Sequence, residues 1–583
     1  MHGKITRSPI ALLLGVSVSA GAASAPALLE AQSGRLATPS AGGMVVSSHY
    51  LASEAGQSIL KKGGNAVDAA VATAFALAVT LPSAGNIGGG GFLVYHGADG
   101  EVTTFNFREK SSRHATERMY LGADGNIRDN SNHAGLLAVG VPGTVAGMWK
   151  AHQRLGLLPW ADLVEPAIRL ADDGMPSTWA MRGWLSSLPG REGPLYDATR
   201  DAFLKNGTDL YEPGETFRQP DLAQSLRRIQ ADGHDGFYGG ETARLIAEFM
   251  AAHGGLIDEE DLALYEAEEL PPIRGSYRGY DVYGMPPPSS GGTVLVQMLN
   301  VLEGYDMAEA GHNSARSLHL MTEAMRRAYA DRARYLGDPN FNPDMPLARL
   351  ISKEYAADLR LGINEARASV SDSARFNDAL LAESAQTTHY SVVDADGNAV
   401  SVTYTLEYSY GSSIVVPSAG FLLNNELGDF NAIPGLTNSR GRIGTPPNLV
   451  AAEKRPLSSM TPTIVAMDGK PVLVIGSPGG RTIINTVLQV ILNTIDYGMT
   501  GSRFGRAIES PRIHHQWLPD ATSFEEWGFS PDTRRLYEAM GHAVTTRSGQ
   551  GSAMGIYIDQ ATNMRWGAAD SRAYDGGARG RDQ

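Results

Sequence analysis

Two threonines stand opposite each other in a predicted β-hairpin, and this placement could make one of them a nucleophile. Two alternating β-branched runs flank the Asp/Gly/Asn-rich turn 394–398, which is a strong hairpin pattern. If the turn is centred on Asp396, Thr387 pairs with Thr405, and both hydroxyls lie on the same face. A threonine at the head of a strand can act as a nucleophile once the bond that precedes it, here Gln386–Thr387, is cut. Its own α-amine then serves as the base.

The chemistry of such a site follows from the threonine itself. In the precursor the Thr387 hydroxyl would attack the Gln386 carbonyl and form an ester by an N→O acyl shift, which water hydrolyses. The released α-amine has a reference pKa of ~7.7–8.0, low enough to take the hydroxyl proton near neutral pH. Thr405 is expected to orient Thr387. His389 lies two residues along on the same face and is interpreted as a packed residue rather than as a base. Taken alone, however, Thr387 is an ordinary strand threonine, because threonine favours strands.

A second segment has the composition of an oxyanion hole. The apolar strand 472–475 is followed by a glycine-rich turn with Gly479 and Gly480, and then by a helix with apolar residues at helical spacing. Glycines where a strand meets a helix N-terminus can present backbone N–H groups to a developing negative charge. If this segment stood alone, a plain strand-to-helix turn would be the better interpretation. The glycine run 88–91 lacks the Gly-Lys-Ser/Thr ending of a phosphate-binding loop and predicts close backbone packing near the site.

Composition limits the class of protein. The 583 residues are 42% hydrophobic and 19% charged, as in an ordinary globular protein with ample core, and the formal charge of −14 argues against nucleic-acid binding. Cysteine is absent, so the fold must be held by its core without disulfides. The longest internal apolar run, 66–81, is too short to span a membrane, and an integral membrane protein is not expected.

The amino terminus has the pattern of an export signal. Two basic residues precede the apolar stretch 10–20, and small residues end at Ala23-Ser24-Ala25, an Ala-x-Ala cleavage site. Pro26 makes that site imperfect, and cleavage after Ala22 is the alternative. We therefore predict a signal peptide over residues 1–25 and a periplasmic or secreted protein.

The remaining chain reads as one intertwined domain. A helix capped by Ser53 is predicted to stop at Gly63-Gly64, and further helices are predicted over 66–80 and 315–335. Residues 140–270 are mainly helical, with Gly/Pro breaks. The polar, irregular segment 340–385 suits an accessible tether ahead of Thr387.

Several motifs in the same order resemble those of γ-glutamyltranspeptidases (glutathione hydrolases), members of the N-terminal-nucleophile hydrolase superfamily. These motifs are Phe107-Arg108-Glu109, Gln386-Thr387-Thr388-His389-Tyr390-Ser391-Val392-Val393-Asp394, Leu423-Asn424-Asn425-Glu426, Arg455-Pro456-Leu457-Ser458-Ser459-Met460 and Gly476-Ser477-Pro478-Gly479-Gly480. The resemblance runs in outline from about residue 40 to the end. It implies an α/β (α+β) protein with a four-layer αββα sandwich. It further implies that self-cleavage gives a large subunit, 26–386, and a small subunit, 387–583, which together form a heterodimer.

The resemblance also implies roles for individual residues. Thr387 is the catalytic nucleophile, Thr405 orients it, and the amides of Gly479 and Gly480 hold the oxyanion. The remaining matches are substrate-binding residues: Arg108, Ser458 and Ser459 for the γ-glutamyl α-carboxylate, and Glu426 and Asp429 for its α-ammonium. An arginine suits a carboxylate because it can donate a bidentate pair of hydrogen bonds. Taken alone, Arg108 would more often be a surface salt-bridge partner.

Two positions depart from the family pattern. Glu407 stands where many transpeptidases carry Asn, which adds a third acidic group to the substrate-binding set and leaves the efficiency of transpeptidation open. The Gly/Pro/Asn-rich segment 430–455 matches the family's lid, and Arg440 replaces the gating tyrosine of some bacterial members. The lid is therefore expected to close differently or to stay more open.

The expected function is a self-processing γ-glutamyl hydrolase and transferase that acts on glutathione or related γ-glutamyl compounds, with water, an amino acid or a dipeptide as acceptor. No cofactor is expected. No metal site is expected either, because His514-His515 lacks accompanying ligand residues. Two alternatives remain: a related acylase on glutaryl- or cephalosporin-type amides, and an unprocessed exported protein that binds γ-glutamyl compounds.

Overall fold

Two antiparallel sheets form the centre of the fold in the computed structural model, which describes residues 36–371, 387–440 and 442–583. Each sheet has seven strands. In spatial order the first sheet is β1 (Thr38–Ser40), β18 (Met564–Ala569), β17 (Met554–Asp559), β13 (Lys470–Gly476), β12 (Thr463–Met467), β9 (Tyr280–Gly284) and β8 (Ile273–Tyr277). The second is β19 (Gly577–Gly580), β2 (Met44–Ser47), β10 (Thr388–Val393), β11 (Ala399–Thr405), β3 (Gly90–His96), β4 (Val102–Phe107) and β7 (Glu268–Leu270).

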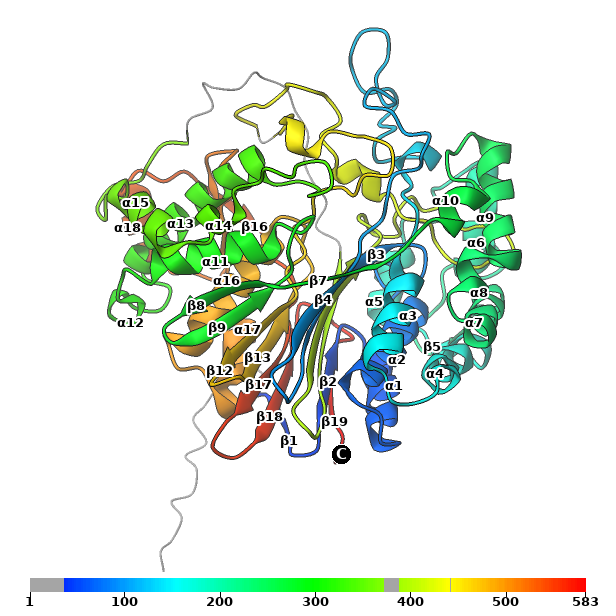
Figure 1. Ribbon diagram of the computed structural model, residues 1–583, viewed down its shortest axis with the longest axis horizontal. Coiled ribbons are helices and arrows are strands. Elements are labelled where there is room, and N and C mark those ends of the chain that lie inside the picture. The colour runs from blue at the N-terminus through cyan, green and yellow to red at the C-terminus, as the bar shows by residue number, and fades with distance from the viewer. Residues whose placement is uncertain (1–35, 372–386, 441) are drawn as a thin grey trace, which may run out of the picture. The chain divides into compact units, whose positions relative to one another are not determined.

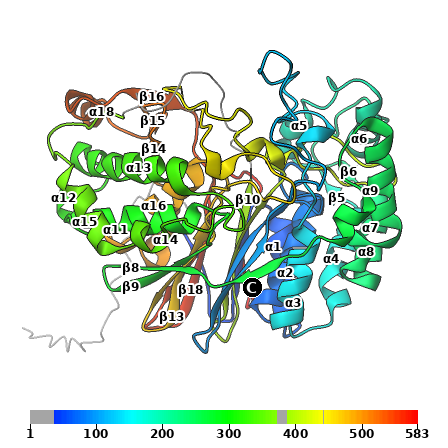
Figure 2. The ribbon, with the colours of Figure 1, turned by 45° about the horizontal axis from the view of Figure 1, so that its top comes forward.

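The two sheets face each other and carry helices on their outer faces (Figures 1 and 2). Between the sheets, apolar residues such as Val46 and Val94 of the second sheet pack against Val474 and Ile556 of the first. The helices α1 (Tyr50–Lys61) and α2 (Ala66–Thr80) belong to the core that covers the second sheet. On the first sheet lie α11 (Gly291–Leu302) and α16 (Thr482–Ile495), and α13 (Ala315–Tyr335) packs on α11. This confirms the predicted four-layer αββα sandwich.

The remaining elements surround these layers. Beside the second sheet are α3 (Thr144–Leu155), α4 (Trp160–Asp172), α5 (Trp179–Leu185), α6 (Asp197–Phe203), α7 (Pro220–Asp232), α8 (Asp235–Tyr238), α9 (Gly240–His253), α10 (Glu259–Ala263) and the small pair β5 (Met175–Pro176) and β6 (Thr216–Phe217). Beside the first are α12 (Met307–Ala310), α14 (Leu347–Leu350), α15 (Lys353–Leu361), α17 (Phe504–Glu509), α18 (Pro531–Ala539), β14 (Ile513–His514), β15 (Thr522–Glu525) and β16 (Val544–Arg547).

The central hairpin has the predicted register. Thr388 pairs with Tyr404 and Val393 with Ala399, which places Thr387 level with Thr405 at the open end. At the closed end the Asp394 carboxylate accepts the main-chain N–H groups of residues 397 and 398, each over 2.9 Å, as expected of an Asp-initiated turn.

Local sequence sets the two helices that follow β2. The helix α2 covers the predicted residues 66–80, and Asn65 caps it with a capping box that uses Asp68. The predicted start of α1 at Ser53 is wrong, because the helix begins at Tyr50 behind a His49 cap. Ser53 is buried instead and donates to the main-chain oxygen of Gly577 over 2.8 Å. A long-range bond to β19 therefore uses the side chain that would otherwise cap a helix.

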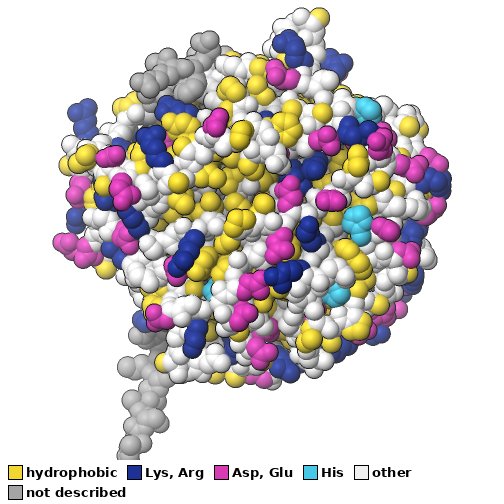
Figure 3. Space-filling view, in the orientation of Figure 1, with side chains coloured by type: hydrophobic (Ala, Val, Ile, Leu, Met, Phe, Trp, Pro, Cys, Tyr) yellow, Lys and Arg dark blue, Asp and Glu magenta, His cyan; other side chains and the backbone are white. Residues whose placement is uncertain are grey.

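The surface of the described residues carries mixed charge. On the face shown in Figure 3, acidic and basic side chains are interspersed, with hydrophobic side chains between them. Within the described ranges, every helix is too short or too polar to cross a lipid bilayer.

Candidate functional site

A small cavity at the open end of the hairpin collects nine of the ten predicted catalytic and substrate-binding residues. Its lining is Arg108, Thr387, Thr405, Glu407, Glu426, Asp429, Ser458, Ser459, Met460, Gly480 and Ile483. The tenth residue, Gly479, directly precedes Gly480 in the chain. These positions come from both sheets and from loops more than 300 residues apart, so their convergence on one cavity is a property of the fold. Gln386 lies outside the described residues.

Thr387 immediately precedes β10 and is 8% exposed. Its neighbour across the hairpin, Thr405, accepts the main-chain N–H of Glu407 at Oγ1 over 2.9 Å. A hydroxyl has one proton and two lone pairs, so this bond leaves the Thr405 proton for another acceptor. Thr387 and Thr405 both line the cavity.

The glycine run ahead of β3 packs against the same threonine. The main-chain oxygen of Thr405 accepts from Asn86 Nδ2 over 2.9 Å. A Cβ on Gly89 would lie only 2.0 Å from that oxygen. The run therefore allows close backbone approach, as predicted, and fixes Thr405 from behind.

Three histidines that follow Thr387 in the chain, His389, His514 and His515, make only buried packing and hydrogen-bond contacts. His389 is fully buried, with Nδ1 2.8 Å from Thr403 Oγ1 and Nε2 3.1 Å from Ser391 Oγ. Burial lowers the pKa of His389 to about 3, so the ring stays neutral, in agreement with its interpretation as a packed residue. His514 and His515 are buried away from the cavity, bonded to Asn485 and Asp520.

Two groups of side chains elsewhere are close enough to share a cation. His319, Glu323 and His542 form the buried group, and His114, Asp258 and Asp261 the other. Glu323 is already paired with Arg327 over 2.6 Å, and Arg326 lies 3.4 Å away on its other side. These guanidiniums compete with a cation for the same carboxylate, so the buried group is better described as an ion-pair cluster.

The turn between β13 and α16 has the geometry expected of an anion-binding turn. Gly479 and Gly480 have φ angles of +136° and +56°, a conformation that favours glycine at both positions. The turn ends at the N-terminus of α16, which begins at Thr482. Successive backbone N–H groups in this arrangement create positive potential, and Gly480 faces the cavity that holds Thr387.

Arg108 lies at the end of β4 and is completely buried. Its two terminal nitrogens donate to Glu426 and Asp429, and its Nε donates to the main-chain oxygen of Pro456 over 3.2 Å. Burial opposes the charge, but the carboxylates of Glu426, Asp429 and Glu109 outweigh burial and raise the pKa of Arg108. The group is therefore a fixed cation in the cavity that Thr387 also lines, and it is not a surface salt-bridge partner.

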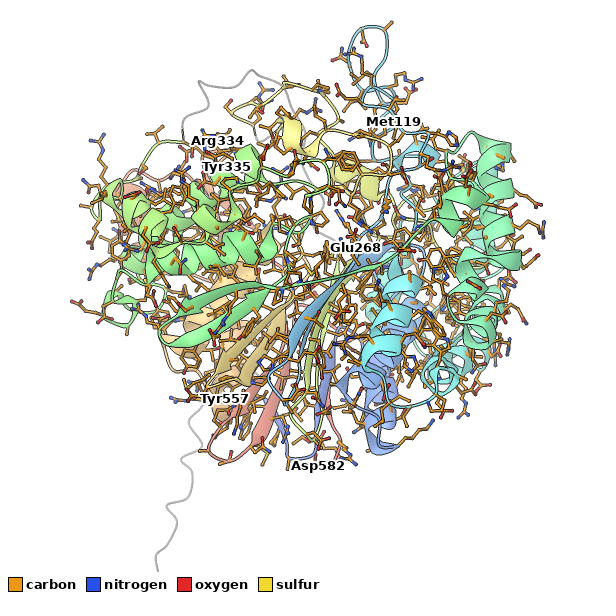
Figure 4. The ribbon with its side chains drawn as sticks, in the orientation of Figure 1. Met119, Glu268, Arg334, Tyr335, Tyr557 and Asp582 are labelled. Atoms are coloured by element: carbon orange, nitrogen blue, oxygen red, sulfur yellow. The ribbon has the colours of Figure 1, made fainter. Side chains whose placement is uncertain are left out.

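A second buried arginine holds the backbone of the first. Arg455 Nε donates to the main-chain oxygen of Arg108 over 3.3 Å, and its NH1 pairs with Glu268 over 2.9 Å. Glu268, labelled in Figure 4 on the edge strand β7, also accepts from Asn106 over 2.7 Å. The edge of the second sheet thus fixes where the Arg108 guanidinium can lie.

The acidic groups around Arg108 outnumber it. Glu109 Oε2 lies 3.6 Å from Arg108 NH1, and burial raises the pKa of Glu109 to about 7. Burial also raises the pKa of Glu426 well above its usual value. The cluster therefore does not carry its full negative charge near neutral pH. A ligand that brings both an anion and a cation would satisfy Arg108 and the carboxylates together.

Glu407 has a partner that sequence reasoning missed. His133 Nδ1 lies 3.3 Å from Glu407 Oε1, both side chains are buried, and the His133 ring stacks on Tyr408 at 4.9 Å between centroids. Gly428 allows this approach, because a Cβ there would lie 2.2 Å from His133 Nδ1. The extra acid therefore lies beside a buried histidine from a distant loop that carries no recognisable motif.

The loop over residues 430–455 is anchored at its base. Asn448 Nδ2 donates to the main-chain oxygen of Asp429 over 2.7 Å, and Asn448 Oδ1 accepts from Leu457 N over 2.9 Å. Arg440 is exposed and is not among the residues that line the cavity. The lid role of this loop stays a prediction.

A threonine at a strand head, an electropositive glycine turn and a four-layer αββα sandwich together define the N-terminal-nucleophile hydrolase class. The γ-glutamyltranspeptidase family model matches residues 52–580. The glutathione hydrolase proenzyme of Escherichia coli (strain K12) is 47% identical over 533 residues, which cover 91% of each chain. The acylase ACY 1 proenzyme of Pseudomonas sp. (strain SE83) is 38% identical over 541 residues, which cover 91% of this chain and 92% of that relative. Among solved structures, a cephalosporin acylase from Bacillus halodurans matches with a TM-score of 0.82 at 28% identity, over 95% of this chain and 98% of that one.

The chain belongs to the γ-glutamyltranspeptidase family. It is accordingly an enzyme of the γ-glutamyl hydrolase and transferase class, with a precursor that processes itself.

Proposed function

We propose that this protein cleaves the γ-glutamyl amide bond of glutathione and related compounds and transfers the γ-glutamyl group to water, an amino acid or a dipeptide. The observation that carries the proposal is the shared cavity of Thr387 and Arg108, in which Arg108 lies between Glu426 and Asp429. The α-carboxylate and α-ammonium of a γ-glutamyl group present the complementary pair of charges at one carbon.

The precursor is proposed to mature in two steps. Residues 1–25 direct export to the periplasm or the medium and are removed. Thr387 then attacks the Gln386 carbonyl, and hydrolysis of the ester separates a large subunit, 26–386, from a small subunit, 387–583. The two subunits form a heterodimer. Strands of both subunits interleave in the second sheet, since β2 of the large subunit lies between β19 and β10 of the small subunit, which supports their staying together after cleavage.

The reaction follows from the positions of the cavity residues. The freed α-amine of Thr387 takes the proton of its hydroxyl, and Oγ attacks the γ-carbonyl of the donor. The amides of Gly479 and Gly480 stabilise the tetrahedral oxyanion, and the amine leaves with the proton. Water or an acceptor amine, deprotonated by the same α-amine, then attacks the γ-glutamyl ester and restores Thr387. Thr405 orients the nucleophile through its hydroxyl proton.

A second candidate function is the acylase activity printed in the names of two relatives, the Pseudomonas proenzyme and the B. halodurans enzyme. A glutaryl group has the carboxylate but lacks the ammonium. The acidic groups Glu407, Glu426 and Asp429 would then face no cation from the substrate, which disfavours such donors.

The decisive experiment compares purified wild-type protein with a Thr387→Ala variant. Intact-mass and N-terminal analysis should give two chains for the wild type, the smaller one starting at Thr387, and one chain for the variant. A variant that still matures would refute Thr387 as the processing nucleophile. A wild-type protein that remains uncut but binds glutathione would favour the alternative of a binding protein.

Donor choice is tested with matched anilides. The wild-type enzyme should hydrolyse L-γ-glutamyl-p-nitroanilide with a higher kcat/KM than glutaryl-p-nitroanilide. The opposite preference would favour the acylase function while leaving the processing mechanism intact. Adding glycylglycine to the γ-glutamyl reaction then measures transfer against hydrolysis.

A further inference from the structure

We infer that Arg332 and Ser290, which do not line the cavity, are positioning residues for the serine pair Ser458 and Ser459. This inference rests on the proposed function in one respect only, namely that the serine pair binds a donor carboxylate. The segment 286–292 (Pro-Pro-Pro-Ser-Ser-Gly-Gly) is conspicuous in the sequence, yet it takes no part in the chemistry described above.

The contacts form a buried relay behind the cavity. Arg332 Nε donates to Ser290 Oγ over 2.9 Å, and Arg332 NH2 donates to Ser459 Oγ over 2.8 Å. Ser290 in turn donates to the main-chain oxygen of Ser458 twice, from Oγ over 2.6 Å and from its own N–H over 2.8 Å. All four residues are buried. One guanidinium thus fixes a side chain of the serine pair directly and its backbone through Ser290.

The direction of these bonds determines what the serines can do. A guanidinium only donates, so Ser459 Oγ must accept from Arg332 and keeps its own proton for another acceptor. Ser458 Oγ accepts the main-chain N–H of Met460 over 3.1 Å and likewise keeps its proton. Both serines line the cavity. They are therefore set to donate to an anion there, and the Arg332 charge makes Ser459 a stronger donor.

The neighbouring glycine and serine explain why this segment is built of small residues. Ser289 Oγ donates to the main-chain oxygen of Met460 over 2.6 Å. A Cβ on Gly291 would lie 2.5 Å from that same oxygen. The loop that carries Ser458 and Ser459 therefore rests directly on the start of α11. Any larger residue at Gly291 would lift the serine pair away from Arg332.

The helix that carries Arg332 also contacts the proposed oxyanion turn. Tyr329 lies one helical turn earlier on α13, and its hydroxyl donates to the main-chain oxygen of Arg481, the residue after Gly480. The last turns of α13 therefore contact both the carboxylate side and the oxyanion side of the cavity. These contacts join parts of the chain that lie on opposite sides of the expected cleavage at Thr387.

The test measures KM and kcat of Arg332→Gln with three donors that differ only at one carbon. L-γ-Glutamyl-p-nitroanilide carries carboxylate and ammonium, glutaryl-p-nitroanilide only the carboxylate, and 4-aminobutyryl-p-nitroanilide only the ammonium. The variant should raise KM about 10- to 100-fold for the two carboxylate donors, with kcat changed only slightly, and leave the 4-aminobutyryl donor unaffected. Ser290→Ala should act in the same direction more weakly.

Two controls separate positioning from general damage. Arg334→Gln changes an exposed arginine two residues along the same helix, labelled in Figure 4, and should leave all three donors unchanged. Combining Arg332→Gln with Ser459→Ala should raise KM beyond Ser459→Ala alone by no more than Ser290→Ala does, because the contact with Ser459 Oγ is already lost and only the route through Ser290 remains. Arg332→Lys should restore part of the affinity. Intact mass and melting temperature establish that each variant is processed and folded.

The outcomes distinguish this inference from the proposed function. A wild-type enzyme that prefers the glutaryl donor would refute the proposed donor, yet Arg332→Gln should still raise the glutaryl KM. An unchanged KM for the carboxylate donors in a processed Arg332→Gln variant would overturn the inference. Equal losses for all three donors, or additive effects with Ser459→Ala, would reduce Arg332 to a structural residue. If Arg332→Gln fails to fold, Ser290→Ala and Arg332→Lys supply the same comparison.

Discussion

The main-chain N–H of Glu407 donates to Thr405 Oγ1 over 2.9 Å, which joins the residue that departs from the family pattern to the one that lies opposite Thr387 in the hairpin. Glu407 has a φ of +78°, and this left-handed conformation turns its N–H back toward the strand it has just left. The bond uses one lone pair of the Thr405 hydroxyl, so this hydroxyl keeps its proton for donation to another acceptor. The backbone at Glu407 therefore takes part in orienting the Thr405 hydroxyl.

This relationship predicts the effect of removing the Thr405 hydroxyl. Thr405→Val keeps the shape of the side chain, and we expect it to slow both precursor cleavage and kcat by roughly 100-fold, because Thr387 loses its orienting partner. Thr405→Ser keeps the hydroxyl and should retain most of both rates. The measurements are the disappearance of the precursor on a gel and the steady-state rate with L-γ-glutamyl-p-nitroanilide. Full activity in Thr405→Val would contradict this role.

Glu407 itself is predicted to contribute to donor selectivity. Glu407→Asn removes one negative charge, and Asn tolerates a positive φ. We expect the ratio of kcat/KM for γ-glutamyl over glutaryl anilide to fall about tenfold, since an attraction for the ammonium is lost together with a repulsion of the ammonium-free donor. Glu453→Asn is a matched control, because Glu453 also has a positive φ, +60°, and is exposed outside the cavity. If the ratio of the two kcat/KM values is unchanged in Glu407→Asn, the Glu407 charge does not contribute to donor recognition.

The pKa of Glu109 predicts a pH dependence of donor affinity. Burial raises this pKa from 4.5 to about 7, so the carboxyl near Arg108 loses its proton as pH rises through neutrality. The added negative charge competes with the donor carboxylate for Arg108, and KM for γ-glutamyl donors should rise from pH 6 toward pH 8, roughly severalfold. In Glu109→Gln this rise of KM with pH should disappear. KM profiles of both proteins, measured also with the 4-aminobutyryl donor as a control without carboxylate, decide the point.

The raised pKa of Glu109 also predicts how stability changes with pH. For this carboxyl, stability falls as pH rises, whereas an acid with a lowered pKa gives the opposite trend. A carboxyl with a raised folded-state pKa contributes stability that is fully present below its unfolded value of 4.5 and is lost as pH rises through about 7. The stability of Glu109→Gln relative to the wild type should therefore be higher above pH 7 than at pH 5. Melting temperatures of both proteins across this range measure the difference, and parallel curves would contradict the assignment.

The sequence pattern predicts those helix bounds and strand registers that depend on interactions between residues close together in the chain. The helices over 66–80 and 315–335 form with the predicted bounds, because their caps, Asn65 and Ser314, and their apolar spacing lie within the segments themselves. The hairpin register also follows from the turn alone. The start of α1 fails because Ser53 bonds to β19 at the far end of the chain.

The candidate site divides in the same way. The residues at the cavity surface could be found from motifs, whereas the residues behind them could not. His133 and Arg332 act through contacts with Glu407 and Ser459, each more than 100 residues away in sequence. His133 lies in a polar loop and Arg332 in a Tyr/Arg-rich helix, and in neither case do the neighbouring residues predict the contact partner. Only the three-dimensional fold brings these pairs together.

The proposed oxyanion turn at Gly479 and Gly480 gives the last prediction. Gly479 has a φ of +136°, which is almost restricted to glycine, and a Cβ there would lie 2.4 Å from Thr482 Oγ1. Thr482 Oγ1 itself donates to the main-chain oxygen of Gly479 over 2.8 Å and so holds the turn. Gly479→Ala should therefore displace the amides of the turn and lower kcat about 100- to 1000-fold with KM nearly unchanged, because these donors act mainly in the transition state.

A second glycine separates this displacement from simple backbone strain. Gly469 has a φ of +73° in the β12–β13 turn, and a Cβ there meets no other atom within 4 Å. Gly469→Ala should cost about 1–2 kcal/mol of stability through its left-handed backbone and leave kcat intact. If Gly479→Ala only lowers the melting temperature as Gly469→Ala does and keeps its kcat, the turn does not hold the oxyanion. A large loss of kcat confined to Gly479→Ala would tie the reaction to these amides, since both variants carry the same added methyl group.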